Sequence, residues 1–399
     1  MLALAYIGAI PFAIYPSALG RSLVAIFSAP FMIVWTLEKL RSQELVRVRP
    51  FPMALIGLFC GWAALTGFWA STEAPVLSAV LSLMWSAATT VAIADVLSRL
   101  WLSALVSLSA GAMLLSTIVL ISPQTISGRA NLGGIDENLT SFVLSVGAGA
   151  GLFLFQAVKS RLGRWIAGAG LLLIGLAVLY TGSRTGVVAT GLMAVATALF
   201  AVSSGSGRGI RAALALFAAL TLIGSLASSY DLMPRRIQQF LGGEADGIND
   251  SGRGEISDLF LRTVDRWFIA GVGYSSDAHY LAGTEGIYRN AHGIFWKTWV
   301  ELGIIGVLIL SAIVGAAVIS SFQLPSRRAV WLMMITLTCF GLTLGGLSVD
   351  AFWLVVSFAI ACPSGHSASV YASDRTNFPS TSRRHFGSTR EQMPSDSCL

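Results

Sequence analysis

Residues 165–202 read WIAGAGLLLIGLAVLYTGSRTGVVATGLMAVATALFAV, two apolar runs that a polar turn at residues 181–186 joins. Each run approaches the length of about 20 residues that a helix needs to cross the hydrocarbon core of a bilayer. The stretch therefore predicts a transmembrane helical hairpin, since a helix satisfies its own backbone groups in lipid. Because the turn is short, Arg184 is expected at or just inside the membrane boundary.

The composition of the whole chain agrees with this interpretation. Of its 399 residues, 55% are hydrophobic and only 12% are charged, and the mean hydropathy is +0.73. Because soluble domains carry roughly a quarter charged residues, an ordinary soluble protein is excluded. The pI of 9.4 does not indicate nucleic-acid binding, since the 26 Lys and Arg residues are scattered through short connections. The 4 cysteines form neither a disulfide framework nor the paired spacing of a zinc site.

Apolar segments of near-spanning length recur along the chain, so we expect an all-α fold with about twelve transmembrane helices. The first segment has no basic residue ahead of it and no signal-peptidase pattern, and we expect it to be retained. The last two segments are short for two full spans. The predicted spans are residues 2–20, 22–37, 51–70, 75–95, 100–121, 138–158, 165–181, 185–202, 210–230, 292–320, 329–345 and 347–362.

Basic residues alternate between the two sides of these spans. The positive-inside rule therefore predicts that both termini are cytoplasmic and that the long loop at residues 231–291 is extracytoplasmic. The basic-rich connections contain Lys39, Arg41, Arg47, Arg49, Arg99, Lys159, Arg161, Arg164, Arg208, Arg211, Arg327 and Arg328. The opposite short turns contain only Arg21, Arg129 and Arg184.

This prediction divides the chain into four parts. Residues 1–230 carry transmembrane helices one to nine, residues 231–291 form the extracytoplasmic loop, residues 292–362 carry helices ten to twelve, and residues 363–399 form a cytoplasmic tail. The tail is rich in Ser and Thr and has too few aliphatic residues for a core, so we expect it to be disordered.

The long loop contains signals for two short helices. Pro234 opens the first and the glycines at 242–243 close it. Residues 250–251 cap an amphipathic second helix that ends at residues 271–273. Its apolar face should lie on the membrane surface or on the helix bundle and turn the loop arginines elsewhere. The face comprises Ile256, Leu259, Phe260, Thr263, Val264 and Trp267, and the arginines are Arg253, Arg262 and Arg266.

Polar groups that hydrophobicity does not explain collect on the extracytoplasmic side. The middle of the predicted spans is almost free of ionisable residues, which argues against an ion-coupled transporter. The polar set comprises Arg129, Asn131, Asp136, Glu137 and Asn138 after the fifth span, then Arg184, the loop arginines, Arg289, Asn290 and His292.

Arg184 and His292 each have two interpretations. Arg184 either anchors the membrane interface or grips an anionic group through two hydrogen bonds. His292 is either a hydrogen-bonded residue at a helix start or a base that accepts the proton of a hydroxyl nucleophile at neutral pH. Nearby aromatic residues either form an interfacial belt or stack on sugar rings. They are Tyr274, Tyr280, Tyr288, Trp296 and Trp299.

The order of these motifs resembles the O-antigen ligase and polymerase superfamily across about residues 120–320. The resemblance implies a C-type glycosyltransferase fold in a bacterial cytoplasmic (inner) membrane, with an extracytoplasmic active site. The matching features are Gly128-Arg129, Gly133-Gly134, Asn138, Ser183-Arg184-Thr185-Gly186, Ser251-Gly252-Arg253, Gly271-Val272-Gly273, Ala291-His292 and Glu301-Leu302-Gly303-Ile304-Ile305-Gly306.

The resemblance also implies an activity and roles for residues. A whole glycan would pass from undecaprenyl diphosphate to a hydroxyl of a glycan or lipid-linked acceptor, without metal or other cofactor, alongside other polysaccharide-assembly proteins. Arg184 and Arg253 would grip the diphosphate, whose departure is favoured when its charge is neutralised. His292 would orient or deprotonate the acceptor. Further substrate contacts are expected from Arg129, Asn138, Arg262, Arg266, Arg289 and Asn290.

The chain departs from the family pattern at three places. Gly293 follows the histidine where the family has Asn, and Asn290 is a candidate to supply that amide. Ser257 stands where the family has Trp, four residues after the loop-helix arginine. Arg262 and Arg266 compete with Arg253 for the second phosphate-binding role.

Two other classes of function stay open. A glycolipid flippase or transporter should line a path with polar groups on both sides of the membrane, whereas a non-catalytic polysaccharide-export subunit should tolerate substitution of Arg184 and of His292. Within the enzyme class, ligation of a finished polymer and polymerisation of repeat units both fit, in O-antigen or other surface-polysaccharide assembly. Either enzyme requires Arg184, Arg253 and His292 to converge in one outward-facing chamber.

Overall fold

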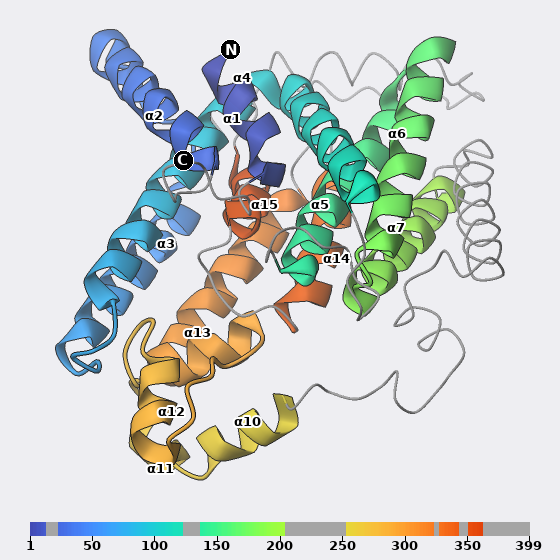
Figure 1. The fold of residues 1–399 in the computed structure, drawn as a ribbon. Coiled ribbons are helices and arrows are strands. Elements are labelled where there is room, and N and C mark those ends of the chain that lie inside the picture. The colour runs from blue at the N-terminus through green and yellow to red at the C-terminus, as the bar shows by residue number, and fades with distance from the viewer. Residues whose placement is uncertain (13–22, 123–135, 204–252, 323–326, 343–349, 362–399) are drawn as a thin grey trace, which may run out of the picture.

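The computed structural model is a bundle of helices (Figure 1). It describes residues 1–12, 23–122, 136–203, 253–322, 327–342 and 350–361. Within these ranges there is no strand, only an isolated bridge between Val48 and Ala361. The predicted all-α class is therefore confirmed for the part that the structure describes. The span predicted at residues 210–230, the first loop helix and the tail lie outside the described residues.

Several helices in the first half of the chain start at a capping residue or a proline. The Asp136 carboxylate accepts the backbone N–H of Asn138 at 2.7 Å, and the Ser160 hydroxyl accepts that of Gly163 at 3.1 Å. Pro50 is the first residue of its helix, where its missing N–H costs nothing. The elements are α1 Leu2–Ala9, η1 Ile10–Phe12, α2 Leu23–Ser42, α3 Pro50–Leu65, η2 Thr66–Phe68, α4 Val76–Ile121, α5 Glu137–Ala157, α6 Arg161–Tyr180 and α7 Arg184–Ser203.

Helix α4 combines the spans predicted at residues 75–95 and 100–121. As a straight helix its 46 residues would reach about 69 Å, roughly twice the thickness of a bilayer core. Leu100, at φ −119° and ψ 31°, lies outside the helical region and kinks the helix. Figure 1 shows the two arms of α4 running in different directions from this region.

The second half of the described chain holds one helix that the sequence did not predict. The expected amphipathic helix is divided at Thr263, whose φ of −119° and ψ of 20° interrupt it. Helix α12 was not expected, although Gly286 in the left-handed conformation is a usual helix end. The elements are α10 Arg253–Leu261, α11 Val264–Trp267, α12 Asp277–Glu285, α13 Ile294–Ser321, α14 Arg327–Gly341 and α15 Asp350–Ile360.

Five of the described helices are long and apolar enough to cross a membrane, which confirms a multi-pass membrane protein. The total of about twelve stays a prediction. The five are Pro50–Phe68, Val76–Ile121, Glu137–Ala157, Arg161–Tyr180 and Ile294–Ser321, and shorter apolar helices cover Leu2–Phe12, Arg184–Phe200, Arg328–Gly341 and Asp350–Ile360.

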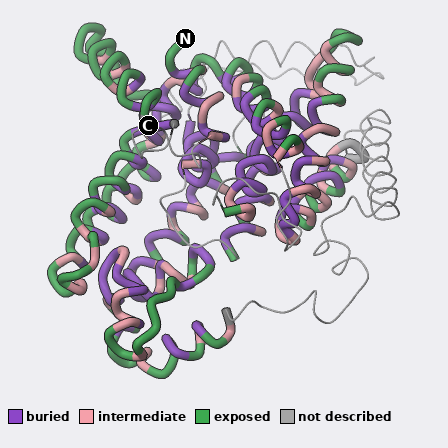
Figure 2. The backbone as a smooth tube through the Cα atoms, viewed as in Figure 1, coloured by how far each residue is buried: buried purple, intermediate pink, exposed green. Residues whose placement is uncertain are grey.

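Helix α15 lies at the centre of the bundle. Every residue from Ala351 to Ala361 is buried, and Figure 2 shows the surrounding tube of α5 and α14 mostly buried as well. With 11 residues, α15 is about 16 Å long, half the thickness of a bilayer core. Its first residue, Asp350, lies inside the span predicted at residues 347–362. Asp350 is therefore an ionisable residue within a predicted span, where few were expected.

Candidate active site

Helices α7 and α14 run antiparallel, which decides which termini meet. The Arg328 guanidinium lies 5.9 Å from the centre of the Phe200 ring. Further along, the Thr336 hydroxyl donates to the Met193 sulfur at 3.3 Å. Because the sequence numbers rise on one helix and fall on the other, the start of α7 and the end of α14 lie at the same end of the bundle.

A hydrogen-bonded turn carries Arg184 at this end. The Ser183 hydroxyl donates to Oδ1 of Asn138 in the first turn of α5, at 3.0 Å, and accepts the backbone N–H of Gly186 at 3.3 Å. Gly182, at φ 73°, turns the chain between the two helices. Arg184 itself is half-buried at the first position of α7. Asn138 therefore holds the turn that presents Arg184.

His292 lies in the connection between α12 and α13, and its side chain is exposed. A Cβ added to the neighbouring Gly293, which has φ 90°, would lie 2.9 Å from the carbonyl oxygen of Leu342. Leu342 directly follows α14. His292 therefore lies beside the end of α14, at the same end of the bundle as Arg184.

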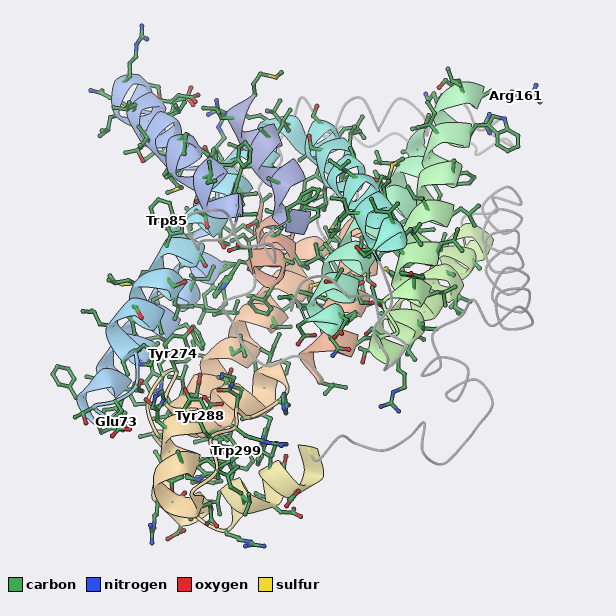
Figure 3. All side chains as sticks on the ribbon, in the orientation of Figure 1. Glu73, Trp85, Arg161, Tyr274, Tyr288 and Trp299 are labelled. Atoms are coloured by element: carbon green, nitrogen blue, oxygen red, sulfur yellow. The ribbon has the colours of Figure 1, made fainter. Side chains whose placement is uncertain are left out.

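The remaining predicted site residues divide into three groups. Arg262, Arg266, Arg289 and Asn290 are exposed. Arg253 is the first residue of α10, and Arg129 lies outside the described residues. Arg161 belongs to the basic connections that were predicted to be cytoplasmic. Figure 3 shows Arg161 at the end of the molecule opposite to Tyr288 and Trp299. The convergence of Arg184, Arg253 and His292 in one chamber remains a prediction.

The loop helices pack on the bundle, one of the two predicted alternatives for their apolar face. The packed residues form a cluster of Ile256, Leu259, Phe260, Trp267, Val272, Leu281, Ala291 and Val300. Arg262 and Arg266 point away from it and are exposed, as the amphipathic pattern predicted.

Helix α13 is interrupted at Gly303, and residues 268–273 fill the interruption. The backbone N–H groups of Val272 and Gly273 donate to the carbonyls of Val300 and Glu301 at 2.8 and 2.9 Å. In return, the Ile304 N–H donates to the Phe268 carbonyl at 2.9 Å. The interrupted backbone is thus hydrogen-bonded by the loop, as buried backbone groups must be.

The contact between residues 268–273 and the interrupted helix α13, here called the joint, requires glycine at three positions. Gly271, Gly273 and Gly303 have φ of 76°, 104° and 68°, where other residues are strained. A Cβ at Gly271 would collide with the carbonyl of Glu301, and one at Gly303 with the carbonyl of Ile269. The glycines that carried the sequence resemblance therefore allow two backbones to approach closely.

Of the five aromatic candidates for sugar stacking, only Tyr288 is well exposed, at 65%. Tyr274 is buried, and this burial together with the nearby Glu301 carboxylate raises the pKa of its phenol above its usual value. Trp296 and Trp299 pack against Trp267, with ring centres 6.2 and 5.5 Å away. Most of these rings therefore serve packing.

The sequence reasoning missed a buried ion cluster under His292, formed by Asp277, Lys297 and Glu301. The only signal in the sequence was Lys297 four residues before Glu301, a common surface spacing in helices. Within the described ranges, no three His, Cys, Asp or Glu side chains are grouped so as to hold a metal ion.

These features define a multi-pass helical membrane protein with polar side chains gathered at one end of the bundle. A family model described as O-Antigen ligase matches residues 169–311, which include Arg184, Arg253 and His292. The resemblance to the O-antigen ligase and polymerase superfamily, whose members are membrane glycosyltransferases, is thereby confirmed. No curated protein matches the chain.

Among solved structures, the chain is similar to one from a structure that concerns polymerization and crosslinking by a peptidoglycan synthase complex. The two chains share 17% sequence identity, with a TM-score of 0.42 over 82% of this chain and 98% of that chain.

Proposed function

We propose that this protein transfers a glycan en bloc from an undecaprenyl-diphosphate carrier to an acceptor hydroxyl, on the extracytoplasmic face of a bacterial inner membrane. The observation that carries the proposal is the shared position of Arg184 and His292 at one end of the bundle, inside the region that matches the O-antigen ligase family. The lipid bilayer, the lipid-linked donor and a glycan or lipid acceptor are the partners.

The chemistry needs one charge-neutralising group and one proton acceptor. The acceptor oxygen forms a bond to the anomeric carbon of the donor while the bond from that carbon to the diphosphate oxygen breaks. Arg184, with Arg253, neutralises the negative charge that grows on the departing diphosphate. His292 takes the proton of the acceptor hydroxyl, because a histidine with an unperturbed pKa near 6.5 can accept a proton at neutral pH. The carrier leaves as undecaprenyl diphosphate.

Two features of the structure support these roles. The turn bonded to Asn138 fixes the start of α7, so that the Arg184 guanidinium meets its ligand at little entropic cost. The exposed side chains at 288–290 precede His292 closely in the chain and form a polar and aromatic group suited to an acceptor sugar. Tyr288 is its aromatic member.

The deciding experiment incubates the purified full-length protein with a defined undecaprenyl-diphosphate oligosaccharide. A ladder of products on a gel identifies a polymerase, and one discrete shift with an added acceptor identifies a ligase. Absence of any product overturns the proposal. If the protein is a transporter, it should instead move a fluorescently labelled form of this glycolipid across a vesicle membrane. If it is a non-catalytic subunit, cells that carry Arg184→Ala or His292→Ala should keep its function.

A further inference from the structure

Three ionisable side chains, of which Asp277 and Glu301 are buried and Lys297 is partly buried, lie next to the backbone on either side of His292. Nζ of Lys297 lies 3.1 Å from both carboxylate oxygens of Asp277 and 3.3 Å from Oε1 of Glu301. The two carboxylate side chains are 1% and 3% exposed. A charge this deeply buried is costly unless it is paired, and Lys297 is the cation that lies next to both carboxyl groups.

One of these carboxylates reaches the backbone beside His292. Oδ2 of Asp277 accepts the N–H of Ala291 at 2.7 Å. On the other side, the Gly293 carbonyl accepts the N–H of Lys297 at 2.8 Å. Ala291 and Gly293 are both buried, while His292 between them is exposed. The backbone is therefore held on each side of a side chain that points outward.

The bond from Ala291 is a charge-assisted one. A carboxylate acceptor makes a hydrogen bond roughly twice as strong as a neutral acceptor does, provided that it stays ionised. Lys297 supplies the positive charge that pairs with the Asp277 carboxylate in this buried place. The backbone N–H of Lys297 is also the donor of the hydrogen bond to the Gly293 carbonyl. Lys297 therefore takes part in the contacts on both sides of His292.

The geometry points to Asp277 as a positioning residue for His292, with Lys297 as the cation that sustains it. Asp277 touches no substrate. It fixes the Ala291 N–H, and through the backbone it fixes the direction in which the imidazole meets the acceptor hydroxyl. This inference rests on the proposed role of His292. A displacement of about 1 Å in a reacting group can lower a rate 100-fold, so losing this bond should act on turnover.

The chain contains a matched control in α4. Asp95 has a side chain that is 3% exposed, lies 3.0 Å from Nζ of Lys39 and accepts the backbone N–H of Arg47 at 2.7 Å. Its burial, ion pair and backbone bond therefore resemble those of Asp277, and it accepts one further hydrogen bond, from the Trp35 indole. Substituting Asp95 reports what the loss of such a group does to folding alone.

The test compares Asp277→Ala, Asp277→Asn and Asp95→Ala in the purified full-length protein, with a defined undecaprenyl-diphosphate oligosaccharide as donor. We expect Asp277→Ala to lower kcat about 100-fold per folded molecule and to leave KM for the donor nearly unchanged. Asp277→Asn keeps an acceptor oxygen and should recover at least about tenfold of the loss. Asp95→Ala should lose similar thermal stability and keep kcat within about twofold.

Hydrogen exchange provides a readout that does not depend on activity. The peptide containing Ala291 should exchange faster in Asp277→Ala and not in Asp95→Ala, because only the first loses the acceptor of that N–H. Unchanged exchange, or an equal fall of kcat in Asp95→Ala, overturns the positioning role. If His292→Ala is inactive and Asp277→Ala keeps its kcat, only this inference fails. If His292→Ala is fully active, the proposed function of His292 itself fails.

Discussion

The indole N–H of Trp62 donates to the carbonyl of Leu302 at 2.9 Å, although 240 residues separate the two. Leu302 lies directly before Gly303, where the backbone of α13 leaves the helical conformation. A carbonyl beside such an interruption loses its usual donor inside the helix. Trp62 of α3 replaces it, so the loop helices, α13 and the membrane-spanning α3 meet at one joint.

Gly303→Ala tests this joint. The added Cβ would collide with the Ile269 carbonyl at a φ of 68°, and left-handed strain together with overpacking should cost about 3 kcal/mol of the free energy of unfolding. We expect a lower thermal midpoint in detergent and a loss of glycan transfer. Gly315→Ala on the same helix is the control, because its Cβ meets nothing within 4 Å. Equal midpoints for the two variants would show that the interruption is not needed.

Arg184→Lys tests how the diphosphate is bound. Lysine keeps the charge and loses the planar pair of donors, so we expect kcat/KM for the lipid-linked donor to fall about 100-fold, which corresponds to about 2.7 kcal/mol. Arg161→Lys at the opposite end of the bundle should leave the kinetics unchanged. A fully active Arg184→Lys would favour the interpretation of Arg184 as an interfacial anchor.

Much of the fold could be predicted because its signals are local. Apolar runs of spanning length and a capping residue such as Asp136 or Ser160 place α5 and α6 within a few residues of their observed bounds. Counting these apolar runs predicted that Arg184 and His292 lie at the same end of the helix bundle. The amphipathic pattern likewise predicted the burial of Ile256, Leu259, Phe260 and Trp267, whereas Thr263 and Val264 of the same predicted face are only half-buried.

The features that the sequence did not predict depend on contacts between distant segments. Asp277 and Lys297 are polar residues in the first turns of α12 and α13, and nothing local shows that folding brings them together. The interruption of α13 is equally hidden, because its donors come from Trp62 and from residues 268–273. The positive φ of Gly303 becomes favourable only when those segments are present.

Asp95→Ala should be among the most destabilising substitutions of an ionised residue in this chain. It removes the partner of Lys39, whose side chain is only 11% exposed, and the acceptor of the Trp35 indole N–H at 3.0 Å. Breaking a buried pair on one side costs about 3–5 kcal/mol, measured as a fall of the thermal midpoint in detergent.

Glu44→Ala is the matched change at an exposed ion pair. Its carboxylate lies 2.7 Å from the Arg99 guanidinium, but the two side chains are 46% and 36% exposed. Such pairs contribute about 0–1 kcal/mol, and less in high salt. A similar midpoint for both variants would mean that Asp95 is not held in the buried network.

The orientation in the membrane can be tested by cysteine labelling. Leu162 is 71% exposed at the basic end of α6, and Tyr288 is 65% exposed near His292. With the native cysteines replaced, Tyr288→Cys should react with a membrane-impermeant maleimide in intact spheroplasts, and Leu162→Cys only after lysis, because basic connections stay cytoplasmic. The donor glycan would then meet His292 outside the cytoplasm. The reverse labelling pattern would place His292 in the cytoplasm and exclude an extracytoplasmic transfer, whatever the activity of the purified protein.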